Sequence, residues 1–226
     1  MKKIENFYLT IQSGRPESNK NPFLLGFFCS FLLFFFSCAS FVLNFSLIFS
    51  PDFSFMRMVE LCMILGFGGA LLFSFRKTKR FFLLFFGTLG ILLLFFLIFR
   101  ADFFRQFSSA LGAVENQVKT VYNFSLFPGY SDSIKDKLVL LIFFLIFYLL
   151  MTLFVMLWKN TILFVLLLGF PFFCSYLLEI PVPAILFFLP VEAFILWKGA
   201  LYPKTISRFW LLVLPAQGLL FLAAAY

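Results

Sequence analysis

Long stretches without a charged residue constrain this chain more than any other feature. Charge-free apolar runs extend from Asn21 to Pro51, from Phe81 to Phe99 and from Leu138 to Trp158. A helix needs about 20 apolar residues to cross a bilayer. Charged residues make up 12% of the chain, too few for a soluble domain, which carries about 25%. We therefore predict an all-α, polytopic bundle of transmembrane helices.

The runs and their shorter neighbours predict about seven spans (six to seven). These are residues 23–43, 55–75, 81–99, 138–158, 161–178, 182–197 and 209–226. They form a membrane domain over residues 21–226, with a long outer loop at 100–137. Residues 1–20 are polar and separate the first lysines from the first apolar run, so we expect a retained cytoplasmic tail rather than a secretory signal.

The distribution of Lys and Arg predicts the orientation. With the N-terminus inside, twelve of the eighteen cations lie in inner segments and six in outer ones. An excess of Lys and Arg on the cytoplasmic side is the expected bias. We therefore predict a multi-pass protein of the bacterial cytoplasmic membrane, N-terminus in and C-terminus out. The net charge of +8 is explained by this topology, and we expect membrane lipid rather than nucleic acid as a partner.

The outer loop contains one amphipathic pattern. Apolar residues recur at spacings of three and four: Phe104, Phe107, Leu111, Val114, Val118 and Val121. Such spacing predicts a helix, which we expect to lie along the outer face of the membrane. Ser109 and Asn116 should then be open to solvent and Leu111 and Val118 covered. The helix is either a connector or a docking surface or lid.

Histidine is absent from the sequence. A Ser-His-Asp or Cys-His arrangement and a His-containing zinc site therefore cannot be built from this chain. The four cysteines form no metal or redox motif: Cys29, Cys38, Cys62 and Cys174. We expect no cofactor, no metal and no catalytic site. A membrane enzyme would have to use outer carboxylates: Asp102, Glu115, Asp132 or Glu179.

Phenylalanine is unusually abundant, at 41 of 226 residues. These side chains either line a cavity for an apolar ligand or serve as generic lipid-facing residues. Their continuous runs, such as 34–36, favour the second interpretation, because a lined cavity needs one selective helix face.

Glu192 is the one ionisable residue well inside a predicted span. Charges at membrane depth often mark ion or solute paths. Pro190 lies two residues earlier and would weaken the local hydrogen-bond ladder. A broken helix beside a carboxylate is typical of a transporter site. The structural alternative is that Glu192 lies near the inner interface.

Small residues in the second and third spans predict close helix packing. Gly66 and Ala70 form a small-xxx-small pair beside Gly69, and the third span carries Gly87 and Gly90. Such residues let helix backbones approach closely, so we expect these two spans to pack as a hairpin. The loop between them carries four cations: Arg76, Lys77, Lys79 and Arg80. They could bind anionic lipid head groups or serve only as a topology signal.

The stretch 107–200 resembles part of a known family. It contains the segment FSSALGAVENQVKTVYNF, an apolar span, the turn WKN, another span and LEIPVPAILFFLP. This order is similar to the N-terminal membrane region of bacterial transglutaminase-like membrane proteins, often encoded beside a MoxR-type ATPase. In that family a catalytic extracytoplasmic domain follows. Residues 1–226 do not include that domain, so the resemblance assigns no catalytic residue. We expect either a truncated relative or a stand-alone membrane partner.

Three functions follow from these patterns. The favoured one is a non-catalytic membrane scaffold or anchor subunit of a bacterial cell-envelope system, with other membrane or envelope proteins as partners. The alternatives are a small-solute transporter or its substrate-binding membrane subunit, which rests on Glu192 and Pro190, and a membrane enzyme without histidine chemistry.

Overall fold

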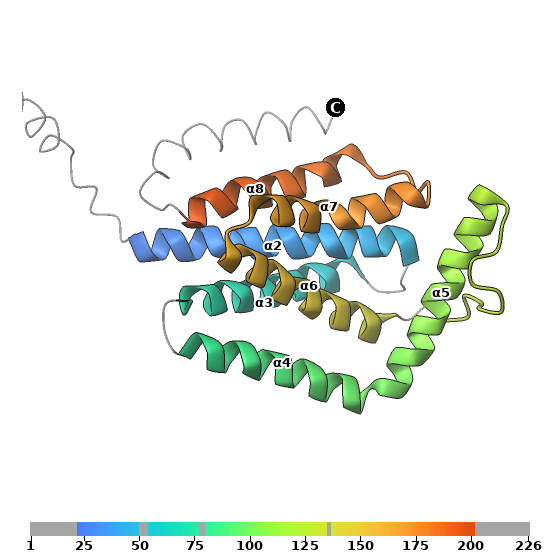
Figure 1. Ribbon diagram of the computed structural model, residues 1–226, viewed down its shortest axis with the longest axis horizontal. Coiled ribbons are helices and arrows are strands. Elements are labelled where there is room, and N and C mark those ends of the chain that lie inside the picture. Colours follow the sequence, from blue (N-terminus) through green and yellow to red (C-terminus); the bar gives the residue numbers. More distant parts are fainter. Residues whose placement is uncertain (1–21, 50–53, 77–79, 135–136, 202–226) are drawn as a thin grey trace, which may run out of the picture.

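The computed structural model describes residues 22–49, 54–76, 80–134 and 137–201. Within these ranges the fold is all-helical, with seven α-helices and one 3₁₀ turn. The helices are α2 (Pro22–Phe49), α3 (Phe55–Ser74), α4 (Arg80–Ile98), α5 (Arg100–Tyr122), α6 (Leu138–Trp158), α7 (Thr161–Leu177), η1 (Ala184–Phe187) and α8 (Phe188–Leu201). Figure 1 shows α2, α3, α4, α6, α7 and α8 running side by side, with α5 crossing one end of the bundle.

Helix α2 lies at the centre of the bundle and contacts α3, α5, α6, α7 and α8. Its buried face carries Leu33, Phe34 and Val42, all at most 1% exposed. The opposite wall of this core includes Leu145 and Leu153 of α6, which are fully buried. The central position of α2 follows from its length, because a 28-residue helix can serve as an axis for shorter neighbours.

Four helices are long and apolar enough to cross a membrane: α2, α3, α4 and α6. Helices α7 and α8 are apolar but shorter. The first helix continues to Phe49 rather than ending near residue 43, because the charge-free run offers no stop signal before Pro51. The predicted span 209–226 lies outside the described residues.

Two glycines of α3, Gly66 and Gly69, pack against α2 and not against α4. A Cβ on Gly66 would lie 3.1 Å from the Phe35 backbone, and one on Gly69 would lie 2.7 Å from the Phe34 ring. Ala70 is fully buried on the same face. For Gly87 and Gly90, no atom of the described residues lies within 4 Å of an added Cβ. Close packing of small residues therefore joins α3 to α2, which differs from the hairpin contact expected from the short loop.

Helix α4 is largely uncovered. Its apolar side chains, including Leu83 at 76% and Ile91 at 67%, are exposed. At its end the chain turns a sharp corner into α5 (Figure 1). The corner is held by Phe103 of α5, whose ring lies 5.2 Å from Phe96 of α4 and 4.8 Å from Phe143 of α6. Aromatic pairs at these distances stabilise the junction beyond the area that they bury.

Two local features shape the second half of the bundle. Lys159 has a left-handed backbone (φ 55°), and the Asn160 side chain accepts the N–H groups of Ile162 and Leu163. These two residues end α6 and cap α7, which explains the short WKN turn.

Pro190 lies in the first turn of α8. The first N–H groups of a helix have no intrahelical partner, so Pro190 removes no hydrogen bond within α8.

Candidate functional site

The polar residues of the described chain concentrate in one unit at the end of the bundle. This unit, residues 100–134, consists of α5 and the segment that follows it, and we call it the α5 cap. Several polar side chains of α5 are buried: Gln106, Ser109 and Glu115 are 4%, 1% and 1% exposed. The segment 123–134 folds back onto this polar face, so the polar groups of α5 bind the chain rather than solvent.

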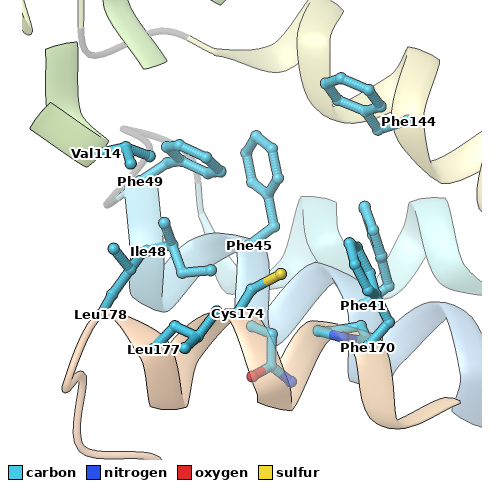
Figure 2. Close-up of a pocket in the computed structure, with 12 residues that line it drawn as sticks. Phe41, Phe45, Ile48, Phe49, Val114, Phe144, Phe170, Cys174, Leu177 and Leu178 are labelled. Carbon is cyan, nitrogen blue, oxygen red and sulfur yellow. The ribbon is translucent and has the colours of Figure 1, made fainter. Parts of the chain in front are cut away.

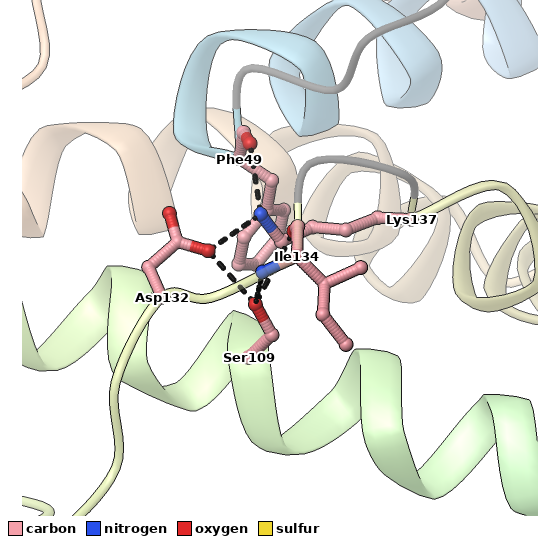
Figure 3. A network of polar contacts seen from close by, with 5 residues as sticks. All are labelled: Phe49, Ser109, Asp132, Ile134 and Lys137. Atoms are coloured by element: carbon pink, nitrogen blue, oxygen red, sulfur yellow. Dashed lines mark hydrogen bonds and ion pairs between the residues drawn. The ribbon is translucent and has the colours of Figure 1, made fainter.

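One polar network joins the cap to the bundle (Figure 3). The Ser109 hydroxyl donates to Asp132 Oδ1 at 2.8 Å and accepts the Ile134 N–H at 3.0 Å. Lys137 Nζ lies 2.9 Å from the same Asp132 oxygen and donates to the Phe49 carbonyl at 3.3 Å. The Lys137 side chain is 1% exposed. A buried cation is costly unless it is paired, so this ion pair fixes the segment to α5 and to the end of α2.

The Glu115 carboxylate is the centre of a second group of hydrogen bonds within the cap. Its carboxylate accepts the Ser125 hydroxyl and the N–H groups of Leu126 and Phe127, the latter at 2.8 and 2.6 Å. Lys119 lies 3.3 Å away on the next turn of α5. The Ser125 hydroxyl, followed by the Phe127 N–H, lowers the pKa of Glu115 to about 2. These donors favour the charged form and hold the start of the returning segment.

Close backbone contact locks the middle of the cap. A Cβ on Gly112 would lie 2.2 Å from the Ser131 carbonyl carbon and 2.5 Å from the Asp132 nitrogen. Only glycine fits here, because the returning backbone occupies the space of a side chain. One turn and a half earlier, Gln106 Oε1 accepts the Leu140 N–H at 3.0 Å. That N–H belongs to the first turn of α6, where donors lack intrahelical partners.

The cap is also tied to the end of α7. Gln117 Nε2 donates to the Leu178 carbonyl at 3.0 Å, and the Tyr122 hydroxyl donates to the Leu177 carbonyl at 2.6 Å. The last carbonyls of a helix have no intrahelical partner, and α5 supplies donors to two carbonyls there. The cap is therefore fastened to α2, α6 and α7.

One position of α5 differs from the expectation, because Ser109 is buried. Phe104 and Phe107 of the apolar stripe are 57% and 36% exposed, as a stripe that faces lipid would be. Asn116 is exposed and Val118 is buried, as predicted. The spacing of the stripe predicts the helix correctly, but it does not show that segment 123–134 covers the polar face.

A cavity of about 390 Å³ lies beneath the cap (Figure 2). It is lined by α2, α5, α6 and the end of α7, through Phe41, Asn44, Phe45, Ile48, Phe49, Val114, Phe144, Phe170, Pro171, Cys174, Leu177 and Leu178. Five of these twelve are phenylalanines, so part of the abundant Phe does line a cavity, which the continuous runs argued against. Phe41, Phe45 and Phe49 lie on one face of α2 at spacings of four, and α6 and α7 contribute one phenylalanine each.

Asn44 is the polar exception in this lining, and it is 1% exposed. Its Nδ2 donates to the Ser40 carbonyl at 2.9 Å, and its Oδ1 accepts the Ser175 hydroxyl at 3.0 Å. The pair joins α2 to α7 across the floor of the cavity. A buried amide needs such partners to offset its desolvation.

Glu192 lies in α8 and is partly buried. It does not line the cavity. Arg76 lies just beyond α3, where its guanidinium is 3.9 Å from the centre of the Phe73 ring. Lys77 and Lys79 lie outside the described residues, and Arg80 begins α4. The structure thus brings neither Glu192 nor the basic cluster into one site with the cap.

Three of the four candidate carboxylates make structural contacts: Asp102, Glu115 and Asp132. Asp102 pairs with Arg105 at 3.1 Å, and Asp132 and Glu115 hold the cap together. Glu179 has a left-handed backbone (φ 52°) in the turn after α7. In the part of the chain that the structure describes, no cluster of three or more acidic, cysteine or histidine residues could hold a metal ion. The sequence-based expectation that these carboxylates share no catalytic task stays a prediction.

Comparison of the chain with protein-family models, with curated proteins and with solved structures finds no match.

Proposed function

We propose that this protein is a non-catalytic membrane scaffold or anchor subunit of a bacterial cell-envelope system, and that the α5 cap is the surface on which it binds an envelope protein. The single observation that carries the proposal is the construction of the cap. A mere connector needs no fixed shape, yet residues 100–134 are held by the Ser109, Glu115 and Gly112 contacts and tied to three helices. Such a preformed surface loses little conformational freedom on binding.

The exposed groups of the cap suit a protein partner. Tyr122, Phe124 and Tyr130 are 44–50% exposed, and Asn116 and Lys119 lie on the same unit. Aromatic side chains are enriched at protein interfaces because they combine a large apolar body with a polar edge. The Lys and Arg distribution supports placing this unit on the outer face, where the resemblance to transglutaminase-like membrane proteins also puts its counterpart.

The scaffold is favoured over the transporter by the start of α8. The transporter hypothesis rests on a helix broken at Pro190 beside Glu192, and Pro190 instead lies in the first turn of α8. A Glu192→Gln variant separates the two hypotheses. A scaffold should keep its partner binding, whereas a transporter should lose solute uptake at unchanged expression and melting temperature.

Site-specific photocrosslinking tests the proposed surface. A photoreactive phenylalanine at Asn116 or Tyr130 should give one discrete protein adduct in living cells. The matched position is Phe173 of α7, which is 58% exposed and should give lipid adducts only. The same protein adducts from all three positions, or none from Asn116 and Tyr130, would contradict the proposal.

A further inference from the structure

The cavity beneath the cap has a lining that suits hydrocarbon. Eleven of its twelve lining residues are apolar, and the atoms of the twelfth, Asn44, already bind Ser40 and Ser175. A water molecule held inside a protein needs two to four polar partners. The cavity provides none that is free of a partner within the described residues. A polar solute would lose its hydration there without compensation.

The size of the cavity argues for an occupant. A volume of about 390 Å³ lies within the range of small-molecule sites, about 300–1,000 Å³. Wall atoms facing an empty space forfeit dispersion contacts that a chain of methylene groups would restore. The apolar walls and the volume together fit one flexible hydrocarbon chain.

The cavity reaches from the surface of the bundle to its core. At the surface, Phe170 and Leu177 of α7 are 57% and 45% exposed. At the inner end, Phe45 and Asn44 of α2 are 5% and 1% exposed. In a membrane, the exposed apolar surface of α7 faces lipid chains. The molecules that meet the cavity mouth are therefore the acyl chains of the bilayer.

We propose that the cavity binds one acyl chain of a membrane phospholipid, which enters past Phe170 and Leu177 and reaches Phe45. This inference rests on the membrane placement proposed above. The lining contains no charged side chain, so the site should select the chain and not the head group. The bound chain would fill the space under Val114 of the cap.

Photolabelling in vesicles tests this assignment with the full chain. The probe is phosphatidylcholine with a diazirine at the end of one acyl chain, present as a trace in phosphatidylcholine vesicles. We expect adducts at the buried Asn44 and Phe45 as well as at exposed positions such as Phe173. A diazirine placed on the head group should label neither buried residue.

The other outcomes overturn the proposal in distinguishable ways. Labelling confined to exposed positions would overturn acyl-chain binding and leave the membrane placement standing. That result would hold equally if residues 202–226 filled the cavity or if the cavity were empty. Absence of labelling at Phe173 and Ile162, both exposed apolar residues of α7, would overturn the membrane placement as well.

Cavity-filling variants supply the matched control. Cys174→Trp adds bulk to the lining and should abolish labelling of Asn44 and Phe45. Phe173→Trp changes the neighbouring exposed position and should leave that labelling unchanged. Val114→Phe fills the cavity from the α5 side and should act like Cys174→Trp. Labelling is compared only among variants whose melting temperature in detergent equals that of the unaltered protein. Persistent labelling of Asn44 and Phe45 in both Cys174→Trp and Val114→Phe would refute the proposal.

Discussion

At the scale of single residues, Gly112 has the strictest requirement. Its neighbour is the backbone of Ser131 and Asp132 at 2.2–2.7 Å from an added Cβ, and backbone cannot move aside as a flexible side chain can. Gly112→Ala should therefore displace the returning segment and destabilise the protein by about 1–3 kcal/mol, the range for overpacking. The measurement is thermal unfolding in detergent.

Gly90→Ala is the matched control for Gly112→Ala. Gly90 also lies within a helix, but an added Cβ there meets no atom of the described residues within 4 Å. Alanine stabilises a helix interior by about 0.5–1 kcal/mol relative to glycine, so the melting temperature should hold or rise. Equal destabilisation by both variants would show that the Gly112 contact does not fix the cap.

Glu115 gives the cap a defined response to acid. Its folded pKa of about 2 lies below the ordinary value of 4.5. A lowered folded pKa contributes stability that is present above the unfolded pKa and is lost as the pH falls toward the folded value. The cap should therefore hold at neutral pH and loosen between about pH 4.5 and 2. NMR titration of the Glu115 carboxyl carbon should give a midpoint near 2.

Glu115→Gln is the control for that titration, because its amide cannot take up the proton and the assigned signal should vanish. A midpoint near 4.5 for Glu115 in the unaltered protein would show that the Ser125, Leu126 and Phe127 donors do not hold the carboxylate.

At the scale of elements, the bonds between α5 and α7 should stabilise the fold measurably. Tyr122→Phe removes the hydroxyl that donates to the Leu177 carbonyl at 2.6 Å. A neutral hydrogen bond contributes about 1 kcal/mol, which corresponds to a fall in melting temperature of roughly 2–4 °C for a domain of this size. Tyr176→Phe removes a hydroxyl from a side chain that is 77% exposed and should leave the melting temperature unchanged. An equal fall in both variants would contradict the role given to Tyr122.

The helices could be predicted from the sequence because their signals are local. The predicted spans 55–75, 81–99 and 138–158 match α3, α4 and α6 to within one residue, and the three-and-four spacing gives α5. The side of α5 that faces the protein could not be predicted. That side depends on Asp132 reaching Ser109 and on the Ser131 backbone reaching Gly112, which are contacts between distant residues.

The cavity could not be predicted for a related reason. Its walls come from four helices. Phe41, Phe45 and Phe49 share one face of α2, but their spacing does not show that α5, α6 and α7 complete the cavity. The close approach of α3 to α2 through Gly66 was likewise invisible, because a small-residue pair shows that a helix can approach another but not which one. The spacing of Gln117 and Tyr122 in the sequence also gave no indication that their side chains donate to the last carbonyls of α7.

At the scale of the whole molecule, the protein is a helical bundle around α2 with the α5 cap at one end. Four helices are long and apolar enough to cross a membrane, and exposed apolar side chains dominate α4. The Lys and Arg distribution favours placing the cap outside. We propose that residues 100–134 form a fixed surface on the outer face.

Cysteine accessibility in intact cells tests that claim most directly. In a background with the four native cysteines replaced by alanine, single cysteines are introduced at Asn116, Ser109 and Thr78 and treated with a membrane-impermeant thiol reagent. We expect labelling at Asn116 in intact cells, at Ser109 only after denaturation, and at Thr78 only after the membrane is permeabilised. Labelling of Thr78 but not Asn116 in intact cells, or equal labelling of Ser109 and Asn116, would contradict it.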